Sequence, residues 1–262
     1  MHPIFLSLGP LKIHWYGVFV ALGFLAAFKV FHKRAPRIGL DLNEAGNLVV
    51  LLFLAGIVGA RVYYVILNWQ DFSAHPLEIF RIDHGGLVFY GGFLMSLLTL
   101  WLWCRWNKRA FALVMDAMVP ALAIAQAFGR VGCFMNGCCY GRECDHFWAV
   151  RPGSPPEVAG HALHPVQLYE TFGLLDIFLT LLVLEKLRRY PGYVACSYVL
   201  LYAFLRFFIE FFRGDLPRVI LGRFTLAQGL CAILFAGAWI ISTRLARRHL
   251  RSRNNVSSPS TS

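Results

Sequence analysis

Charged residues are scarce in this chain. They account for 15% of the 262 residues, whereas a soluble domain has about a quarter. Acidic residues are the rarer kind, with 14 Asp and Glu against 25 Lys and Arg. Apolar residues make up 58% of the chain and aromatic residues 15%. This balance excludes an ordinary soluble domain and predicts an integral membrane protein.

Long apolar runs recur at about the length, 17–25 residues, that crosses a bilayer core of about 30 Å. We place seven spans, at residues 15–31, 46–67, 86–104, 112–134, 165–185, 193–213 and 223–243. The predicted fold class is therefore an all-α membrane protein with about seven transmembrane helices. Residues 1–253 form one polytopic transmembrane domain in this prediction, and the Ser-rich residues 254–262 form a disordered tail.

Basic residues gather in every second connection between the predicted spans. Clusters follow the first, third, fifth and seventh spans, as at Lys33, Arg105, Lys186 and Arg247. Because cytoplasmic loops keep positive charge, we expect a periplasmic N-terminus and a cytoplasmic C-terminus, with a periplasmic insertion at about 135–163. Anionic lipid headgroups account for the net charge of +11 in these loops, so no nucleic acid is expected as a partner.

The chain also lacks the features of a removable signal peptide. The first ten residues carry no basic n-region, and no small-residue cleavage site follows the first span. We therefore expect the first span to be retained.

Seven cysteines are present. Three lie in or near predicted spans, where a thiol usually acts as a small apolar residue: Cys104, Cys196 and Cys231. Four cluster at the outer end of the fourth span: Cys133, Cys138, Cys139 and Cys144. A disulfide within this group is permitted outside the cytoplasm. No second Cys pair or His pair of finger-like spacing follows, so a disulfide is favoured over zinc and no metal ligand is assigned.

Two arginines stand where a bilayer would require apolar side chains. Arg130 follows the apolar run 119–128, and Arg61 lies within the second span. An arginine at membrane depth costs about 2.5–3.5 kcal/mol on insertion scales, so it persists mainly where it has a partner, a water-filled cavity or a function. Arg61 either contacts such a cavity or snorkels to the surface.

The sixth span carries a polar stripe. Its members fall at i, i+4, i+8 and i+11 and share one helix face: Tyr202, Arg206, Glu210 and Arg213. One interpretation is an internal ion pair of Arg206 with Glu210 that holds helices together. Arg130 and Arg213 then remain without a carboxylate, and a surplus of cations in a membrane cavity predicts an anionic ligand such as phosphate, which suits the planar guanidinium.

Polar and glycine residues also mark the first, third and fifth spans. Gln167 and Glu170 lie one turn apart, and they either bond helix to helix or face the same interior as the arginines. Two Gly pairs in 83–92 predict a re-entrant or cavity-lining turn. Tyr90 lies between these pairs, and it lines the cavity or belongs to a headgroup-level belt. Tyr16 is expected at the membrane interface.

Together these segments resemble bacterial prolipoprotein diacylglyceryl transferase. The matching pieces occur in the family's order: Trp15-Tyr16-Gly17, Gly85-Gly86 to Gly91-Gly92, Gly129-Arg130 to Gly141, His164-Pro165 to Glu170, and Arg206-Phe207 to Arg213. No single piece is decisive, but five in register over most of the chain are specific. Seven spans with the N-terminus outside also match the family.

The resemblance implies a reaction in the bacterial inner (cytoplasmic) membrane, at its outer leaflet. The sn-1,2-diacylglyceryl group of phosphatidylglycerol passes to the lipobox cysteine thiol of a prolipoprotein signal peptide. The products are a thioether and glycerol 1-phosphate. The implied partners are therefore membrane lipid and the prolipoprotein, and no metal or organic cofactor is implied.

The resemblance also implies roles for individual residues. The catalytic candidates are Arg206, Tyr90 and Glu210. The substrate-binding candidates are Arg130, Tyr16, Asn136, Gly141, Gln167, Tyr202 and Arg213. In this scheme Arg130 holds the lipid phosphate, and Arg206 assists the leaving group or completes the anion site.

The chain departs from the family pattern at the base. Better-known members have a histidine where this chain has Tyr90, and tyrosine is a poorer base at neutral pH. Cys133 replaces an expected asparagine, and Cys138 stands where a glutamate is usual. His84 or His164 could serve instead, or the arginines could favour the thiolate of the substrate.

Two other functions fit parts of the pattern. A carrier for an anionic solute would use the same arginines, but the chain lacks the internal repeat common in transporters. A paralogue with the same fold could lipidate a different thiol or act in envelope redox chemistry, and sensitivity of its activity to reductant would favour it.

Overall fold

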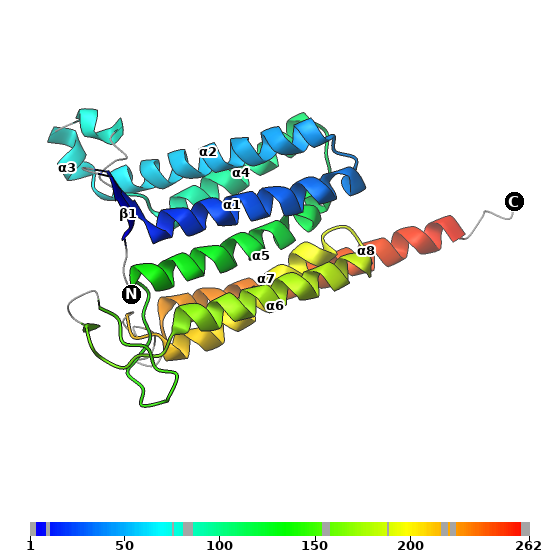
Figure 1. The fold of residues 1–262 in the computed structure, drawn as a ribbon. Coiled ribbons are helices and arrows are strands. Elements are labelled where there is room, and N and C mark those ends of the chain that lie inside the picture. The colour runs from blue at the N-terminus through cyan, green and yellow to red at the C-terminus, as the bar shows by residue number, and fades with distance from the viewer. Residues whose placement is uncertain are drawn as a thin grey trace, which may run out of the picture. The chain divides into compact units, whose positions relative to one another are not determined.

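The computed structural model describes residues 4–8, 11–74, 76–80, 86–153, 158–187, 189–215, 220 and 224–257, and it is mostly helical (Figure 1). Among the described residues, six helical segments are long and apolar enough to cross a membrane. They contain α1 (Trp15–Arg34), α2 (Leu42–Leu67), α5 (Phe111–Asn136), α6 (Val166–Lys186), α7 (Tyr193–Ile209) and α8 (Leu226–Ser257). The prediction of a helical, multi-pass membrane protein is confirmed at this level.

The predicted third span corresponds to α4 (Phe89–Trp106), which is not among the six. Its 18 residues include Gly91 and Gly92 near the start and Arg105 in the last turn. The remaining elements are short: β1 (Ile4–Leu8), β2 (Leu11–His14), α3 (Trp69–Ala74) and the 3-10 turns Ala35–Ile38, Pro76–Phe80 and Glu210–Phe212. The two strands pair antiparallel, an addition to the all-α prediction.

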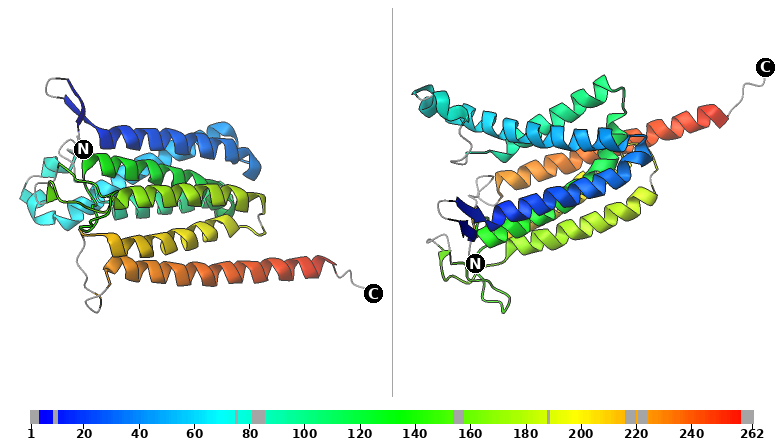
Figure 2. Two further views of the ribbon diagram at one scale, coloured as in Figure 1. Left: turned by 60° about the horizontal axis from the view of Figure 1, so that its bottom comes forward. Right: turned by 45° about the horizontal axis from the view of Figure 1, so that its top comes forward.

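The chain divides into two compact units, residues 1–31 with 115–262, and residues 32–114. In the first unit, α6, α7 and α8 run alongside one another (Figures 1 and 2). Its apolar core joins α5, α6 and α7 through Val119, Ala123, Ile177, Leu181, Val194 and Tyr198. These residues pack α5, α6 and α7 against one another. The same three helices carry the polar side chains described below.

One buried carboxylate ties α5 to the start of α7. Asp116 accepts hydrogen bonds from the backbone N–H groups of Gly192 and Ala195, both at 2.8 Å. These donors belong to the first turn of α7, where N–H groups lack helical partners and a negative charge is favoured. Asp116 is therefore explained as a cap of α7.

In the second unit, α2 and α4 lie side by side through glycines (Figure 1). A Cβ at Gly91 would lie 2.3 Å from Tyr63 Cβ and 2.4 Å from the Gly59 carbonyl oxygen, and one at Gly92 would meet the Gly56 carbonyl oxygen at 2.7 Å. The prediction of a turn over 83–92 is wrong for its last part, because helix α4 begins at Phe89. The second Gly pair serves close helix packing, and residues 83–85 lie outside the described residues.

Arg61 is buried and secures the segment that follows α2. Its Nε donates to the Ile79 carbonyl at 2.8 Å, its Nη2 to the Glu78 carbonyl at 2.6 Å, and its Nη1 to the Gly86 carbonyl at 3.3 Å. The described contacts of Arg61 therefore join chain segments within the second unit. Neither of the two interpretations of Arg61, a cavity contact or snorkelling to the surface, included this role.

Two predicted boundaries differ in the structure. The last helix, α8, extends to Ser257, so the first part of the predicted tail continues a helix, and residues 258–262 lie outside the described residues. The segment between α5 and α6 is irregular, with isolated bridges that pair Leu163 with Glu143 and Val150. Its predicted periplasmic location stays a prediction.

Candidate anion-binding site

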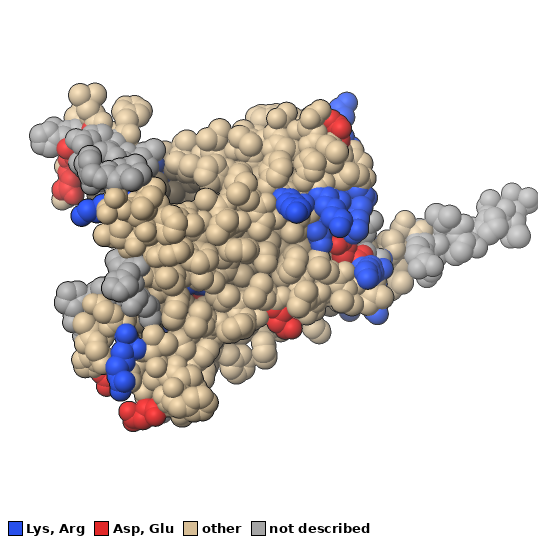
Figure 3. Space-filling view, in the orientation of Figure 1, with Lys and Arg blue, Asp and Glu red and all other residues tan. Residues whose placement is uncertain are grey.

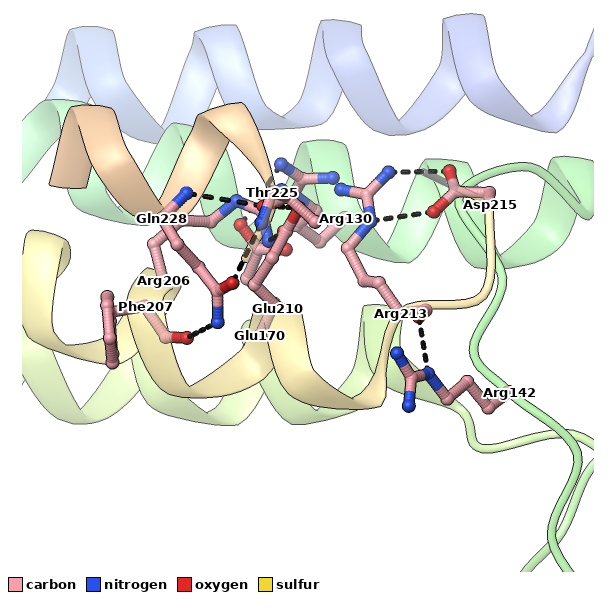
Figure 4. A network of polar contacts seen from close by, with 10 residues as sticks. All are labelled: Arg130, Arg142, Glu170, Arg206, Phe207, Glu210, Arg213, Asp215, Thr225 and Gln228. Atoms are coloured by element: carbon pink, nitrogen blue, oxygen red, sulfur yellow. Dashed lines mark hydrogen bonds and ion pairs between the residues drawn. The ribbon is translucent and has the colours of Figure 1, made fainter. Parts of the chain in front are cut away.

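Arginines and carboxylates from three helices and two connecting segments form one polar network (Figure 4). Arg130 comes from α5 and Glu170 from α6, while Arg206 and Glu210 lie at the end of α7. The network continues through Arg142, Arg213, Asp215, Thr225 and Gln228. All of these residues belong to the first unit.

Arg130 forms an ion pair across the helix interface. Its Nη2 lies 3.0 Å from Glu170 Oε1, and the side chains are 22% and 2% exposed. Burial of a carboxylate without a partner would be very unfavourable, so Arg130 stabilises the buried Glu170 carboxylate. Among the described residues, this ion pair is the only hydrogen-bond or salt-bridge contact of the Arg130 guanidinium. Several of its donors are therefore left to bind another group.

Arg206 pairs with Glu210 one helical turn later, and the two side chains are 11% and 0% exposed. The Thr225 hydroxyl donates to Glu210 Oε1 at 2.8 Å. The Gln228 side chain in turn accepts from the Thr225 backbone N–H at 3.0 Å and donates to the Phe207 carbonyl at 3.3 Å. The start of α8 thus fixes the Glu210 carboxylate, which fixes Arg206.

Arg213 is held in a two-point contact. Its Nε and Nη2 donate to the two carboxylate oxygens of Asp215 at 2.8 and 2.6 Å. Burial acts to lower the pKa of Arg213, but the hydrogen bonds and charge of Asp215 outweigh it, so this pKa lies above its usual value. The Arg213 carbonyl accepts from Arg142 Nε at 3.0 Å.

These contacts correct the prediction that Arg130 and Arg213 lack carboxylate partners. The sequence stripe did not contain Glu170 or Asp215, because one lies on another helix and the other beyond the helix end. Within the described network four arginines face three carboxylates, and the fourth arginine, Arg142, is exposed. The buried part is thus balanced, and an anion would have to share or replace a carboxylate contact.

The segment after α5 is pinned against α6 and the end of α7. Gln167 is buried and donates its Nε2–H to the Cys138 carbonyl at 2.7 Å. Gly141 forms a bridge with Arg213, and a Cβ at Gly141 would lie 2.4 Å from the His164 carbonyl oxygen. Gln167 and Gly141 therefore determine the path of this segment. Gly141 contacts the arginine network through its bridge with Arg213, and Gln167 contacts the segment at Cys138.

The end of α5 is a Schellman motif. The N–H of Cys138 donates to the Cys133 carbonyl at 3.2 Å, the N–H of Gly137 donates to the Phe134 carbonyl at 3.2 Å, and Gly137 has a φ of 76°. This motif usually brings the side chains of its outer two residues together, and here both are cysteines. Asn136, the last residue of α5, lies beside the Cys138 thiol.

Cys139 continues this turn in the left-handed region, with a φ of 61°, a conformation that costs a residue other than glycine about 1–3 kcal/mol. Hydrogen bonds from the thiols of Cys133 and Cys138 lower the pKa of Cys139, and the charges of Arg213 and Arg130 act in the same direction. All seven cysteines of the chain are free thiols in this structure, so the disulfide expected near Cys133 is not formed.

Two predicted tyrosines lie next to the network. Tyr16, in the first turn of α1, interacts electrostatically with Arg130 and with the three cysteines at the end of α5, and Gly132 lets α1 approach, since a Cβ there would lie 3.3 Å from Tyr16 Cδ2. Tyr202 interacts electrostatically with Arg130 and Arg206. Its ring stacks on that of Tyr198, with centroids 5.9 Å apart.

The candidates for a base lie in different parts of the chain. Tyr90 belongs to the second unit, near the start of α4, where its side chain is exposed and packs edge-on against Phe89. His84 lies outside the described residues. His164 Nδ1 lies 3.1 Å from the Tyr169 hydroxyl. Burial lowers the pKa of His164, and the charge of His146 adds to this effect, so both favour the neutral imidazole.

Sequence reasoning missed Asp215, Thr225 and Gln228. Asp215 follows the polar stripe by two residues and is the carboxylate nearest in sequence to Arg213, a signal that could have found it. Thr225 and Gln228 form a side-chain cap at the start of α8, with the Thr225 hydroxyl accepting from the Gln228 N–H at 3.3 Å. The Thr-x-x-Gln spacing is that of a capping box, which would have identified the cap but not its contact with Glu210.

Comparison with known proteins agrees with the resemblance found in the sequence. The family model for prolipoprotein diacylglyceryl transferase matches residues 3–244. The phosphatidylglycerol–prolipoprotein diacylglyceryl transferase of Clostridioides difficile is 30% identical over 257 residues, which cover 98% of this chain and 99% of the relative. The enzyme of the same name from Legionella pneumophila strain Lens is 35% identical, with 92% and 96% covered. The chain therefore belongs to the prolipoprotein diacylglyceryl transferase family.

Proposed function

We propose that the chain transfers the diacylglyceryl group of phosphatidylglycerol to the lipobox cysteine thiol of a prolipoprotein, forming a thioether and releasing glycerol 1-phosphate. Family membership over residues 3–244 supports the reaction class. The observation that assigns the reaction to this site is the arginine network at the ends of α5, α6 and α7. A phosphodiester anion in a membrane requires such cationic partners.

Arg130 is the proposed ligand of the lipid phosphate. Among the arginines in ion pairs at the site, its side chain is the most exposed, at 22% against 11% for Arg206 and 8% for Arg213. Its single ion pair with Glu170 leaves guanidinium donors for a phosphate oxygen. The incoming phosphate would share Arg130 with Glu170, whose near-complete burial keeps the arginine in place.

Arg206 is the proposed group that stabilises charge on the departing phosphate. The thiolate attacks the glyceryl carbon, the bond from that carbon to the phosphate oxygen breaks, and the electron pair leaves with glycerol 1-phosphate. Donors fixed before the reaction stabilise such developing charge most effectively. Glu210 and Tyr202 are proposed to position Arg206, which agrees with the Glu210 ion pair and the Thr225 contact described above.

The other candidates are proposed to shape the substrate site. Tyr16 would line the lipid cavity next to Arg130. Asn136, Gly141 and Gln167 would set the path of the segment after α5, and Arg213 would complete the anion site. Tyr90 is proposed to act through its hydroxyl, as a hydrogen-bond donor to the reacting groups.

The proposed setting is the bacterial inner membrane, with seven spans, a periplasmic N-terminus and a cytoplasmic C-terminus. The six long apolar helices support a multi-pass arrangement, and α4 is the proposed seventh span. The alternating basic connections support the orientation. Phosphatidylglycerol and the prolipoprotein signal peptide would reach the site from within the membrane.

Purified protein in detergent provides the test of this function. The substrates are phosphatidylglycerol labelled in its diacylglyceryl group and a peptide with a lipobox cysteine. Mass spectrometry is expected to find the diacylglyceryl thioether on the peptide, and none on a control peptide with Ser in place of Cys. Folded protein that transfers no lipid to the cysteine peptide would contradict the proposal and point to a different acceptor.

A further inference from the structure

Three thiols converge where α5 ends. The Sγ atoms of Cys133, Cys138 and Cys139 all lie within 4.8 Å of one another, and each of these residues is half-buried. In the part of the chain that the structure describes, no other group of three or more His, Cys, Asp or Glu side chains meets so closely. The role of Cys133 and Cys138 in the Schellman motif explains their approach, and the left-handed turn at Cys139 adds the third thiol.

We propose that these three cysteines bind Zn²⁺ as thiolates and leave a fourth position for the thiol of the acceptor substrate. The metal site itself does not depend on the function proposed above, whereas the use of its fourth position rests on that function. The family resemblance implied no cofactor, so this site would be a property of the present chain.

The dimensions of the cluster suit zinc. Tetrahedral zinc holds thiolate sulfurs at about 2.3 Å, which places the sulfurs about 3.8 Å from one another. The three sulfurs already lie within 4.8 Å of one another, which is close to this separation. A half-buried position also limits competition from water for the metal.

Charge in the surroundings favours thiolates at this place. Three thiolates and one Zn²⁺ carry a net charge of −1, which a half-buried site requires to be compensated. Arg130 and Arg213 both interact electrostatically with Cys139, and Arg130 also does so with Cys133. The guanidinium groups of both arginines therefore favour negative charge on these sulfurs, and each also pairs with a carboxylate.

Three protein ligands and an open position are typical of zinc sites that act on a substrate, whereas structural zinc has four protein ligands. No fourth Cys, His, Asp or Glu joins the three thiols among the described residues. The spacing of these ligands is not that of a zinc finger. In a zinc finger two separated motifs supply the ligands, whereas here all three come from the end of one helix.

The fourth position gives the acceptor thiol a route to its reactive form. The thiol displaces a water molecule from zinc and loses its proton to solvent, because a coordinated thiol is deprotonated. The bound thiolate then attacks the glyceryl carbon, and the carbon–oxygen bond breaks with its electron pair leaving on the phosphate. The thioether that forms is a weak ligand and dissociates. A chain with tyrosine in place of the family's histidine thus needs no strong base.

Metal binding can be measured without the transfer reaction. Full-length protein in detergent, reduced and stripped with a chelator, is loaded with Zn²⁺ or with Co²⁺ and freed of excess metal. We expect about one Zn²⁺ per chain by elemental analysis and, with Co²⁺, the thiolate charge-transfer and tetrahedral d–d absorption of such sites. Absence of both signals in folded, reduced wild-type protein would overturn the proposal.

Matched variants separate the cluster from other thiols. Cys138→Ser and Cys139→Ser should each lose the bound metal, while Cys144→Ser should keep it, because Cys144 lies outside the group of three. Because a variant could fail to fold, alkylation of the wild-type thiols is followed as well. Zn²⁺ should protect Cys133, Cys138 and Cys139 from a maleimide, and equal labelling with and without metal would contradict the site.

The use of the fourth position is tested with the Co²⁺ protein and no lipid. A peptide with a lipobox cysteine should alter the charge-transfer absorption, and the same peptide with Ser in place of Cys should not. An unchanged spectrum with both peptides would show that the acceptor thiol does not bind the metal. Failure of lipid transfer alongside a normal metal response would instead count against the proposed function.

Discussion

Arg130 differs from the other buried arginines in how it meets its surroundings. Arg206 and Arg213 have partners close in sequence, whereas Arg130 reaches a carboxylate on another helix and keeps 22% of its side chain exposed. Its presence at membrane depth was a reliable signal, since such a residue requires a partner or a function. The identity of its partner could not be predicted, because the distance in sequence to Glu170 says nothing about which helix faces which.

The role of Tyr90 is tested at the scale of one atom. Tyr90→Phe removes the hydroxyl and leaves the contact with the Phe89 ring. If the hydroxyl stabilises charge during the reaction, kcat should fall by about 100-fold, as for other preorganised donors, with the phosphatidylglycerol KM little changed. Initial rates of peptide lipidation give both constants.

The matched control for this variant is Tyr63→Phe, since Tyr63 packs on α4 at Gly91 through its Cβ and not its hydroxyl. It should leave both constants near those of the wild type. Equal rates for Tyr90→Phe and the wild type would remove Tyr90 from the catalytic residues and leave it a packing role.

The sequence predicted the positions of most helices, but it did not predict which helices contact one another. The length of the apolar runs identified the six long helices, with boundaries correct to a few residues in most cases. The two Gly pairs before and within α4 were read as a turn, because glycine in a sequence indicates either a bend or a close approach. Only the facing glycines of α2, Gly56 and Gly59, distinguish the second case, and they lie some 30 residues away.

The contact of α2 with α4 predicts opposite effects for two glycine substitutions. Gly91→Ala should destabilise the protein by about 1–3 kcal/mol, because overpacking a close contact has that cost and its Cβ would lie 2.3 Å from Tyr63 Cβ. Gly237→Ala on α8 should be neutral or stabilising, since nothing lies within 4 Å of the added Cβ and alanine favours helix. Unfolding temperatures in detergent measure both, and equal loss in the two variants would contradict the contact.

The whole molecule presents long uncharged surfaces along its helices, as Figure 3 shows on one face. Composition alone predicted this, because so few charged residues cannot cover a soluble protein of this length. The Arg206–Glu210 ion pair, one interpretation of the sequence, is present. The partners of Arg130 and Arg213 were not predicted, since they depend on how the helix ends assemble. Within the described network, the surplus of cations expected from the sequence is a balanced set of ion pairs, apart from the exposed Arg142.

The orientation in the membrane is tested on the intact protein in cells. Single reporter fusions after residues 107 and 252 should report a cytoplasmic location, and fusions at residues 70 and 147 a periplasmic one, because basic connections stay inside. This pattern also requires α4 to cross the membrane. A cytoplasmic signal at both 70 and 107 would show that α4 does not span the bilayer and would contradict the seven-span arrangement.

The central claim is that the arginine network binds the phosphate of the lipid during transfer, and it is tested most directly by one comparison. Lipidation of a lipobox peptide is measured with wild type, Arg130→Ala and Arg109→Ala. Arg109 is an arginine of the other unit that pairs with Glu44. We predict that Arg130→Ala loses at least about 100-fold in kcat/KM while Arg109→Ala stays near the wild type. Full activity of a folded Arg130→Ala protein would contradict the claim.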